Sequence, residues 1–212
     1  MSRQLKDKAL RLFKAAKSQF DRGLFEDSLK NYLFSLDIQE KLSKSDPFLN
    51  TLIAATLYNL GVLLSKMGKP EEAKNSYERA IKMYEGLLAG DPGNAKHQLQ
   101  IAGALNNLGI LLSDMGKPEE AKNSYERAIK MYEGLLAGDP GNVVYQSDVA
   151  GSLNNLGVLL SKMGKPEETK NSYERALKMC EALLAGDSGN VEYQLHVAGA
   201  LNNLGVLLSK MG

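Results

Sequence analysis

The chain has 212 residues, 43% of them hydrophobic, and its formal net charge is +1. This composition is that of a folded protein, and the near-neutral charge gives no long-range attraction to nucleic acid or to an anionic membrane. The single cysteine excludes an intrachain disulfide and is typical of a reducing compartment, so we expect a cytoplasmic protein.

One long segment of the sequence is repeated. The run from Gly68 to Met115 returns almost unchanged at Gly116 and again at Gly164, so the period from residue 68 to residue 116 is 48 residues. Each period holds two segments with apolar residues at every third or fourth position, which indicates two amphipathic helices. Such a unit buries its apolar faces only against its neighbours, so the pattern predicts a stacked-repeat protein.

Residues 1–45 are predicted to form a diverged first repeat. The N-terminal segment is charged and no run of 18 apolar residues occurs in the sequence, so we expect neither export nor a membrane span. A first helix should run from Ser2 to Asp21, with its turn at Gly23. This helix is basic, which favours a solvated cap on the array, and an anchor for an acidic partner is the alternative. On the second helix, Ser28, Tyr32 and Ser35 take the places that Ala121, Tyr125 and Ala128 hold later.

Three full repeats are predicted next, at residues 46–93, 94–141 and 142–189. Gly116 suits the left-handed position after a helix, Pro118 suits a first helical turn, and Asn142 suits an N-cap. With the first repeat and a last, unpaired helix in residues 190–212, the sequence predicts nine helices. Those after the first repeat should lie near 47–67, 70–89, 95–115, 118–137, 143–163, 166–185 and 191–211.

The last predicted helix has no second helix after it. Leu201, Leu204 and Leu208 should therefore lack the cover that their equivalents receive, which indicates either a longer array or a contact with another chain. We predict possible homo-oligomerisation through residues 191–212.

The repeats resemble the tetratricopeptide repeat family. The signature residues are Leu105, Leu108-Gly109 and Leu112 on the first helix of a repeat, Ala121, Tyr125 and Ala128 on the second, and Asp139-Pro140 at the turn. The family's usual period is 34 residues, so this chain is most similar to longer-period members such as the repeats of kinesin light chains. The resemblance implies an all-α, right-handed superhelical solenoid of antiparallel helix pairs over residues 1–212. Thr169, in place of a small alanine, is expected to loosen its repeat slightly.

The resemblance also implies that the first helices line a concave groove for an extended peptide. One asparagine of each repeat then forms a ladder, and its amide can bond both the N–H and the C=O of a peptide backbone. The alternative is structural: these amides hydrogen-bond within and between adjacent first helices. The mixed groove charge favours a neutral to mildly acidic peptide. The ladder consists of Asn59, Asn107, Asn155 and Asn203, and the other predicted groove residues are Tyr58, Asn106, Asn154, Asn202, Lys66, Asp114, Lys162, Lys14 and Lys17.

The sequence contains no arrangement typical of catalysis or of a cofactor site. His97 and His196 take different places in their repeats and lack further ligands at metal-binding spacing, so no metal site is expected. Cys180 replaces a core-type tyrosine and is predicted to be a small buried side chain. Tyrosines without a basic stripe argue against nucleic acid. We therefore predict a non-enzymatic protein-protein interaction scaffold; the alternative is a structural array that self-assembles through its last helix.

Overall fold

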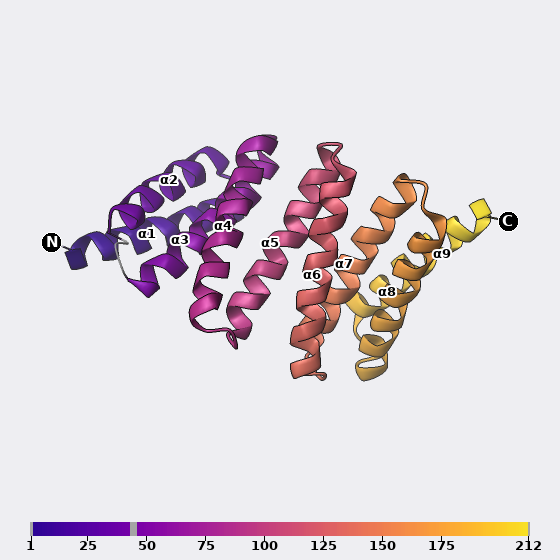
Figure 1. Cartoon of the computed structure of the whole chain (residues 1–212). Coiled ribbons are helices and arrows are strands. Elements are labelled where there is room, and N and C mark those ends of the chain that lie inside the picture. Colours follow the sequence, from indigo (N-terminus) through magenta and orange to yellow (C-terminus); the bar gives the residue numbers. More distant parts are fainter. Residues whose placement is uncertain (1, 43–45, 212) are drawn as a thin grey trace. The chain divides into compact units, whose positions relative to one another are not determined.

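The computed structural model describes residues 2–42 and 46–211, and helices are the only regular elements within them (Figure 1). Every helix after the first repeat lies within one residue of its predicted bounds. The predicted all-α solenoid of helix pairs is confirmed, whereas its superhelical course and repeat boundaries stay predictions. The predicted repeat end at residue 45 lies outside the described residues, as does residue 212. The helices are α1 (Ser2–Asp21), α2 (Phe25–Leu42), α3 (Pro47–Lys66), α4 (Pro70–Gly90), α5 (Ala95–Asp114), α6 (Pro118–Gly138), α7 (Val143–Lys162), α8 (Pro166–Gly186) and α9 (Val191–Met211).

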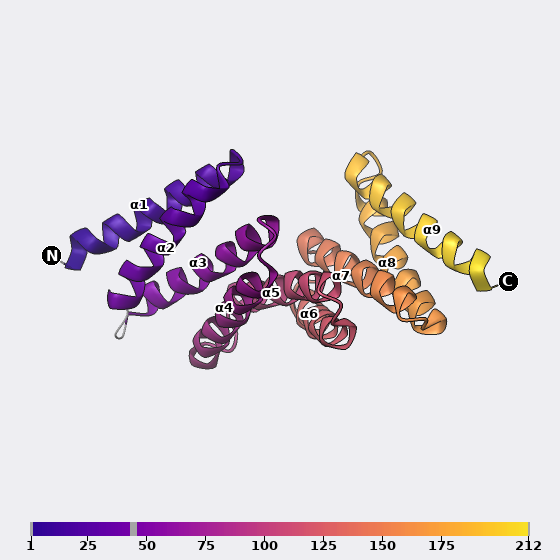
Figure 2. The same ribbon diagram turned by 90° about the horizontal axis from the view of Figure 1, so that it is seen from above.

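The chain divides into two compact units, Met1–Leu111 and Leu112–Gly212, and their boundary falls within α5. In the N-terminal unit, α1 pairs with α2, α3 pairs with α4, and α2 also packs on α3 (Figures 1 and 2). In the C-terminal unit, α7 lies between α6 and α8, and α8 also packs on α9. The second helices α2 and α8 are thus each held by the first helix of their own repeat and by that of the next.

The helix ends follow the turn chemistry predicted from the sequence. Gly116 has a φ of +70°, and its N–H donates to the Ser113 carbonyl at 3.1 Å while the Lys117 N–H donates to the Leu112 carbonyl at 2.9 Å. These two bonds satisfy carbonyls at the end of α5, and Pro118 then begins α6. At the next turn the Asn142 side chain accepts hydrogen bonds from the first backbone N–H groups of α7, as expected of an N-cap.

Glycine allows the two helices of a repeat to approach closely. A Cβ atom placed on Gly157 would lie 2.4 Å from Cε1 of Tyr173, and one on Gly61 would lie 2.6 Å from Cδ1 of Tyr77. The glycine of the first helix therefore makes room for the tyrosine ring of the second helix.

Serine replaces alanine in the core of the first repeat. Ser28 and Ser35 are fully buried and donate hydrogen bonds to the Ala16 and Ala9 carbonyls of α1 at 2.8 and 2.7 Å. Each buried hydroxyl therefore has an acceptor, which removes the cost of burying it. The predicted equivalence of these serines with the later alanines holds, although the packing is polar.

Helix α3 is the most apolar element. Its segment Phe48–Lys66 is long and apolar enough to cross a membrane by composition, but more than half of that window is buried inside the protein. Packing against α2 and α4 accounts for this composition, because both sides of α3 lie in the core.

Candidate peptide-binding surface

The four ladder asparagines lie on the first helices, one each on α3, α5, α7 and α9, and all four are half-buried. None of them points fully into solvent. The predicted neighbours Tyr58, Asn106 and Asn154 are half-buried too. The remaining predicted groove residues are exposed, namely Asn202, Lys66, Asp114, Lys162, Lys14 and Lys17.

Amides of the ladder bond the preceding first helix within each unit. Nδ2 of Asn203 donates to Oδ1 of Asn154 at 2.8 Å, and Nδ2 of Asn107 donates to the Tyr58 hydroxyl at 3.1 Å. In both cases the acceptor belongs to the residue directly before the ladder asparagine of the preceding repeat: Tyr58 comes before Asn59, and Asn154 comes before Asn155. Bonds between first helices, of the kind that the structural alternative predicts, are therefore present for these two residues. Each bond uses one of two amide N–H groups, so Asn203 keeps a second N–H and its oxygen for other contacts.

A cavity of about 460 Å³ lies between α7 and α9, with α8 as its base. We call it the amide pocket. It brings together three of the predicted residues from two neighbouring first helices, and its wall mixes amide groups with small apolar side chains. The polar and reactive side chains among its lining residues are Ser147, Asn154, Asn155, Cys180, Glu192, His196 and Asn203.

Charge at the amide pocket is low. Glu192 is its acidic lining residue, its Oε1 lies 4.0 Å from Nε2 of His196, and no lysine or arginine lines the pocket. The predicted groove charge Lys162 lies at the end of α7, outside the pocket. Lys66, in the other unit, rests over the ring of Phe20 with 4.9 Å between its Nζ and the ring centroid. That cation therefore stabilises the packing of α1 on α3.

Burial raises the pKa of two titratable groups at or near the amide pocket. Cys180 is buried, and burial together with the Glu181 charge raises the pKa of its thiol. A thiol held in its protonated form is a poor nucleophile, so the prediction of a small buried side chain is confirmed. Burial also raises the pKa of the Asp148 carboxyl on α7. Neither group has the low pKa of an activated nucleophile or metal ligand.

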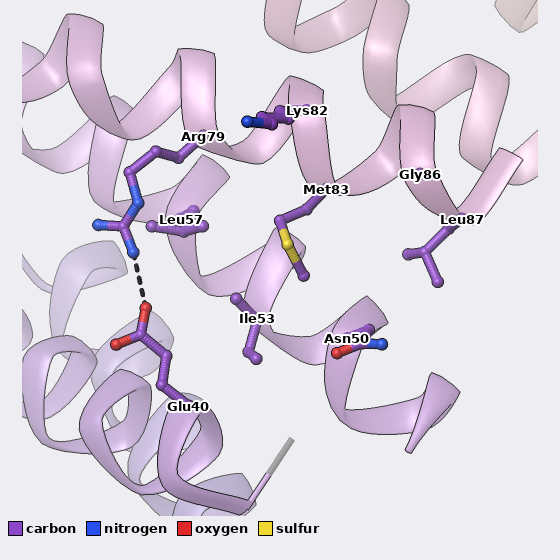
Figure 3. Close-up of a pocket in the computed structure, with 9 residues that line it drawn as sticks. All are labelled: Glu40, Asn50, Ile53, Leu57, Arg79, Lys82, Met83, Gly86 and Leu87. Atoms are coloured by element: carbon purple, nitrogen blue, oxygen red, sulfur yellow. Dashed lines mark hydrogen bonds and ion pairs between the residues drawn. The ribbon is translucent and has the colours of Figure 1, made fainter. Parts of the chain in front are cut away.

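A second cavity, of about 660 Å³, opens between α2, α3 and α4 (Figure 3). We call it the outer groove. Its floor contains Ile53 and Met83, and Nη2 of Arg79 bonds Oε1 of Glu40 at 2.6 Å across it. The sequence carries no local signal for this cavity, because its lining residues come from three different helices.

Neither predicted histidine belongs to a metal site in the part of the chain that the structure describes. His97 packs against the Tyr84 ring, with 6.0 Å between centroids, and His196 lines the amide pocket. Within residues 2–42 and 46–211, no three His, Cys, Asp or Glu side chains form a group that could hold a metal ion.

Models of the tetratricopeptide repeat match residues 8–86, 101–140 and 149–188. No curated protein matches the chain in sequence. Among solved structures, BtubC (BKLC) from P. vanneervenii is similar over 99% of this chain and 86% of its own, with 20% identity and a TM-score of 0.65. The apo form of RapI is similar over 96% of this chain and 64% of its own, with 14% identity and a TM-score of 0.74. The yeast histone chaperone Hif1 is similar over 97% of both chains, with 16% identity and a TM-score of 0.70.

At these identities the solved structures establish a shared fold. The family models extend over most of the sequence, and their repeats coincide with the helix pairs in which Gly61 and Gly157 receive a tyrosine ring. The long period also agrees with the spacing of the helices. On this evidence the chain belongs to the tetratricopeptide repeat family.

Proposed function

We propose that this chain is a non-enzymatic protein-interaction scaffold that binds an extended peptide segment of a partner along its first helices. The family and the helical-repeat neighbours support protein partners, and one of those neighbours, Hif1, is a scaffold protein that recruits protein complexes to core histones. The observation that carries the proposal is the amide pocket, a concave space in which amides of α7 and α9 meet. A cytoplasmic location goes with the proposal as an expectation.

The amide pocket suits a peptide backbone. An extended chain presents an N–H and a C=O group at each residue, and the second N–H and the oxygen of Asn203 offer one donor and one acceptor to such a chain. The bond from Asn203 to Asn154 fixes the orientation of both amides before a ligand arrives. Fixed amides lose little side-chain entropy on binding, which favours affinity.

The charge of the amide pocket narrows the predicted range of ligands, which extends from neutral to mildly acidic peptides. Glu192 is its acidic lining residue, and no lysine or arginine lines it. We therefore place the ligand at the neutral end of the predicted range, with small or apolar side chains opposite Ala150, Ala200 and Leu195.

Peptide display on the intact chain tests this proposal. Peptides selected on the wild type should bind the double variant Asn154→Ala/Asn203→Ala at least about tenfold more weakly in fluorescence anisotropy, because lost hydrogen bonds of this kind weaken affinity by that order. Asn123→Ala, at an exposed position of α6, is the matched control and should bind like the wild type. Equal affinity of the double variant and the control would contradict the proposal.

Self-association through α9 is the second candidate function. The observation that favours it is the exposure of Leu201 and Leu208 on that helix. Light scattering over a wide concentration range should then detect a dimer that Leu208→Lys dissociates. A monomer at every concentration would remove this candidate and would leave the scaffold proposal untouched.

A further inference from the structure

The outer groove of the N-terminal unit carries charge at one end and is apolar along its length (Figure 3). Arg79 and Glu40 face each other at the charged end. Lys82 follows Arg79 by about one helical turn, so both cations lie on the same side of α4. Two cations against one carboxylate give this end a net positive charge, which attracts an anion.

Apolar side chains line the rest of the outer groove. Ile53 of α3 is buried, and the thioether of Met83 on α4 points toward it (Figure 3). Leu87 stands at the far end and is half-buried, whereas its equivalents Leu135 on α6 and Leu183 on α8 are 6% and 2% exposed. The outer groove therefore offers apolar surface to a ligand where the later repeats bury the same leucine.

The dimensions of the outer groove are those of a small-molecule site. Its volume of about 660 Å³ lies within the range of such sites, roughly 300–1,000 Å³. Gly86, at the far end, follows Arg79 by two helical turns, which is a distance of about 10 Å along α4. An extended peptide of that length has only about three residues, and a stable protein interface buries about 800 Å² on each partner. This size favours a small ligand over a protein partner.

We propose that the outer groove binds a small amphipathic carboxylate, with its anionic head at Arg79 and Lys82 and its apolar body along Ile53 and Met83. A carboxylate accepts two parallel N–H bonds from an arginine, and a guanidinium carries five N–H groups, more than one carboxylate occupies. The pair of Arg79 with Glu40 is about half exposed on both sides and therefore weak, so Arg79 can turn to a ligand at little cost. The unbranched side chain of Met83 adapts to the shape of an apolar body.

This site is separate from the one in the proposed function. The outer groove lies in the N-terminal unit and the amide pocket in the C-terminal unit, and the two have no lining residue in common. A ligand in the outer groove would contact α2, α3 and α4 and should stabilise the N-terminal unit. Failure of either proposal therefore leaves the other untouched.

Octanoate is the probe, and octanamide, which has the same hydrocarbon chain without the charge, is its matched control. Octanoate should bind the intact chain saturably in isothermal titration calorimetry. Octanamide should bind at least about tenfold more weakly, because hydrogen bonds to charged groups are the stronger ones. In a chain with ¹³C-labelled methionine methyl groups, octanoate should shift the NMR signal of Met83 and leave that of Met179, its equivalent on α8, in place.

Gly86→Phe should block the outer groove. Gly86 lines the groove, and nothing lies within 4 Å of a Cβ atom placed on it, so a larger side chain can enter the open space. This variant should bind octanoate at least about tenfold more weakly than the wild type. Gly134→Phe, at the equally open position of α6, is the matched control and should bind like the wild type. Circular dichroism should show that both variants keep the helical content, since phenylalanine is a better helix former than glycine.

The charges at the mouth of the outer groove should act in opposite directions. Lys82→Ala should weaken octanoate binding and Glu40→Gln should strengthen it, each by about twofold to fivefold, because the first removes an attractive charge and the second a repulsive one. Lys178→Ala, at the same position of α8, should bind like the wild type. Absence of saturable binding, equal affinity for octanamide, an equal shift of the Met179 signal or unchanged binding by Gly86→Phe would overturn the proposal.

Discussion

In the C-terminal unit, Gly157 lies so close to the ring of Tyr173 that no space is left for one more methyl group. Alanine at position 157 would place its Cβ 2.4 Å from the ring, and both residues are buried, so the ring or a helix has to move. We expect Gly157→Ala to lower the free energy of unfolding by about 1–3 kcal/mol, the usual cost of overpacking a core. Urea denaturation followed by circular dichroism measures this change.

Gly134→Ala is the control for the intrinsic preference of a helix for alanine. Gly134 lies inside α6 with nothing within 4 Å of its Cβ position, so this variant should gain about 0.5–1 kcal/mol. If both variants gain stability, the close packing of the Tyr173 ring on Gly157 is wrong.

Asp148 makes stability depend on pH. Burial raises the pKa of its carboxyl in the folded chain, so the folded state holds the proton to higher pH than the unfolded state does. This carboxyl therefore lowers stability as pH rises from its ordinary value through the raised folded pKa. We expect Asp148→Asn to raise the thermal midpoint at pH 7, and we expect the gain to shrink near pH 3. A gain of equal size at both pH values would contradict the role of burial.

Residue-level prediction succeeded where the cause is local. The cap at Asn142 and the positive φ of Gly116 follow from turn chemistry within a few residues, which the sequence displays directly. The partners of the ladder amides are not local. Asn203 donates to Asn154 on another helix, a partner that the sequence does not specify, because it left both a backbone ligand and an inter-helix bond open.

At the scale of elements, a buried polar network joins the first three helices. Nε2 of Gln39 donates to the Ser35 hydroxyl at 2.6 Å, and the Thr56 hydroxyl lies 3.1 Å from Oε1 of Gln39 and 2.8 Å from the Leu52 carbonyl. All of these side chains except that of Leu52 are fully buried, and Leu52 takes part through its backbone. The network thus ties α2 to α3 by buried hydrogen bonds.

Thr56→Val should lower the free energy of unfolding by about 1–3 kcal/mol, because it leaves the buried Gln39 oxygen without its Thr56 donor. Thr169→Val is the matched control. Thr169 is equally buried, but its hydroxyl donates to the Lys165 carbonyl, which also accepts the Thr169 backbone N–H. Thr169→Val should therefore lower the free energy of unfolding by less than Thr56→Val does, and urea denaturation of both variants measures the two losses. Equal losses would contradict a tie between helices.

Thr169 is expected from the sequence to loosen the packing of the fourth repeat slightly, because it is larger than the alanine that other repeats have at this position. The structure buries it completely and satisfies its hydroxyl at 2.7 Å from the Lys165 carbonyl. Helix bounds were predictable because prolines and glycines mark them, whereas the outer groove was not, since its lining residues come from three helices that are apart in the sequence.

At the scale of the whole molecule, a repeat array is stabilised mainly by contacts between neighbours. The period of the sequence therefore predicted the fold class, because each repeat needs only the next one to bury its apolar residues. The binding surface is less predictable. Identical asparagines stand in several repeats, yet the amide pocket also requires Cys180, Glu192 and His196, which occur in that combination only at α8 and α9.

Neighbour packing predicts unequal stability along the C-terminal unit. The sequences of residues 154–162 and 202–210 are identical, so most of their amides share one intrinsic exchange rate. Helix α7 is packed between α6 and α8, whereas α9 packs on α8 and buries Ala200 and Leu207. Hydrogen exchange should therefore be faster in 202–210 than in 154–162, because fewer contacts have to break when α9 opens.

Chemical labelling of Cys180 is a second way to measure how often α9 separates from α8. Its thiol is 4% exposed and lines the amide pocket beneath α9, so a thiol reagent reaches it only when α9 moves away. We expect Leu207→Ala to accelerate labelling of Cys180 and exchange in 202–210 by the same factor, while exchange in 154–162 keeps its wild-type rate. Exchange in 202–210 that is as slow as in 154–162 would contradict the weaker packing of α9.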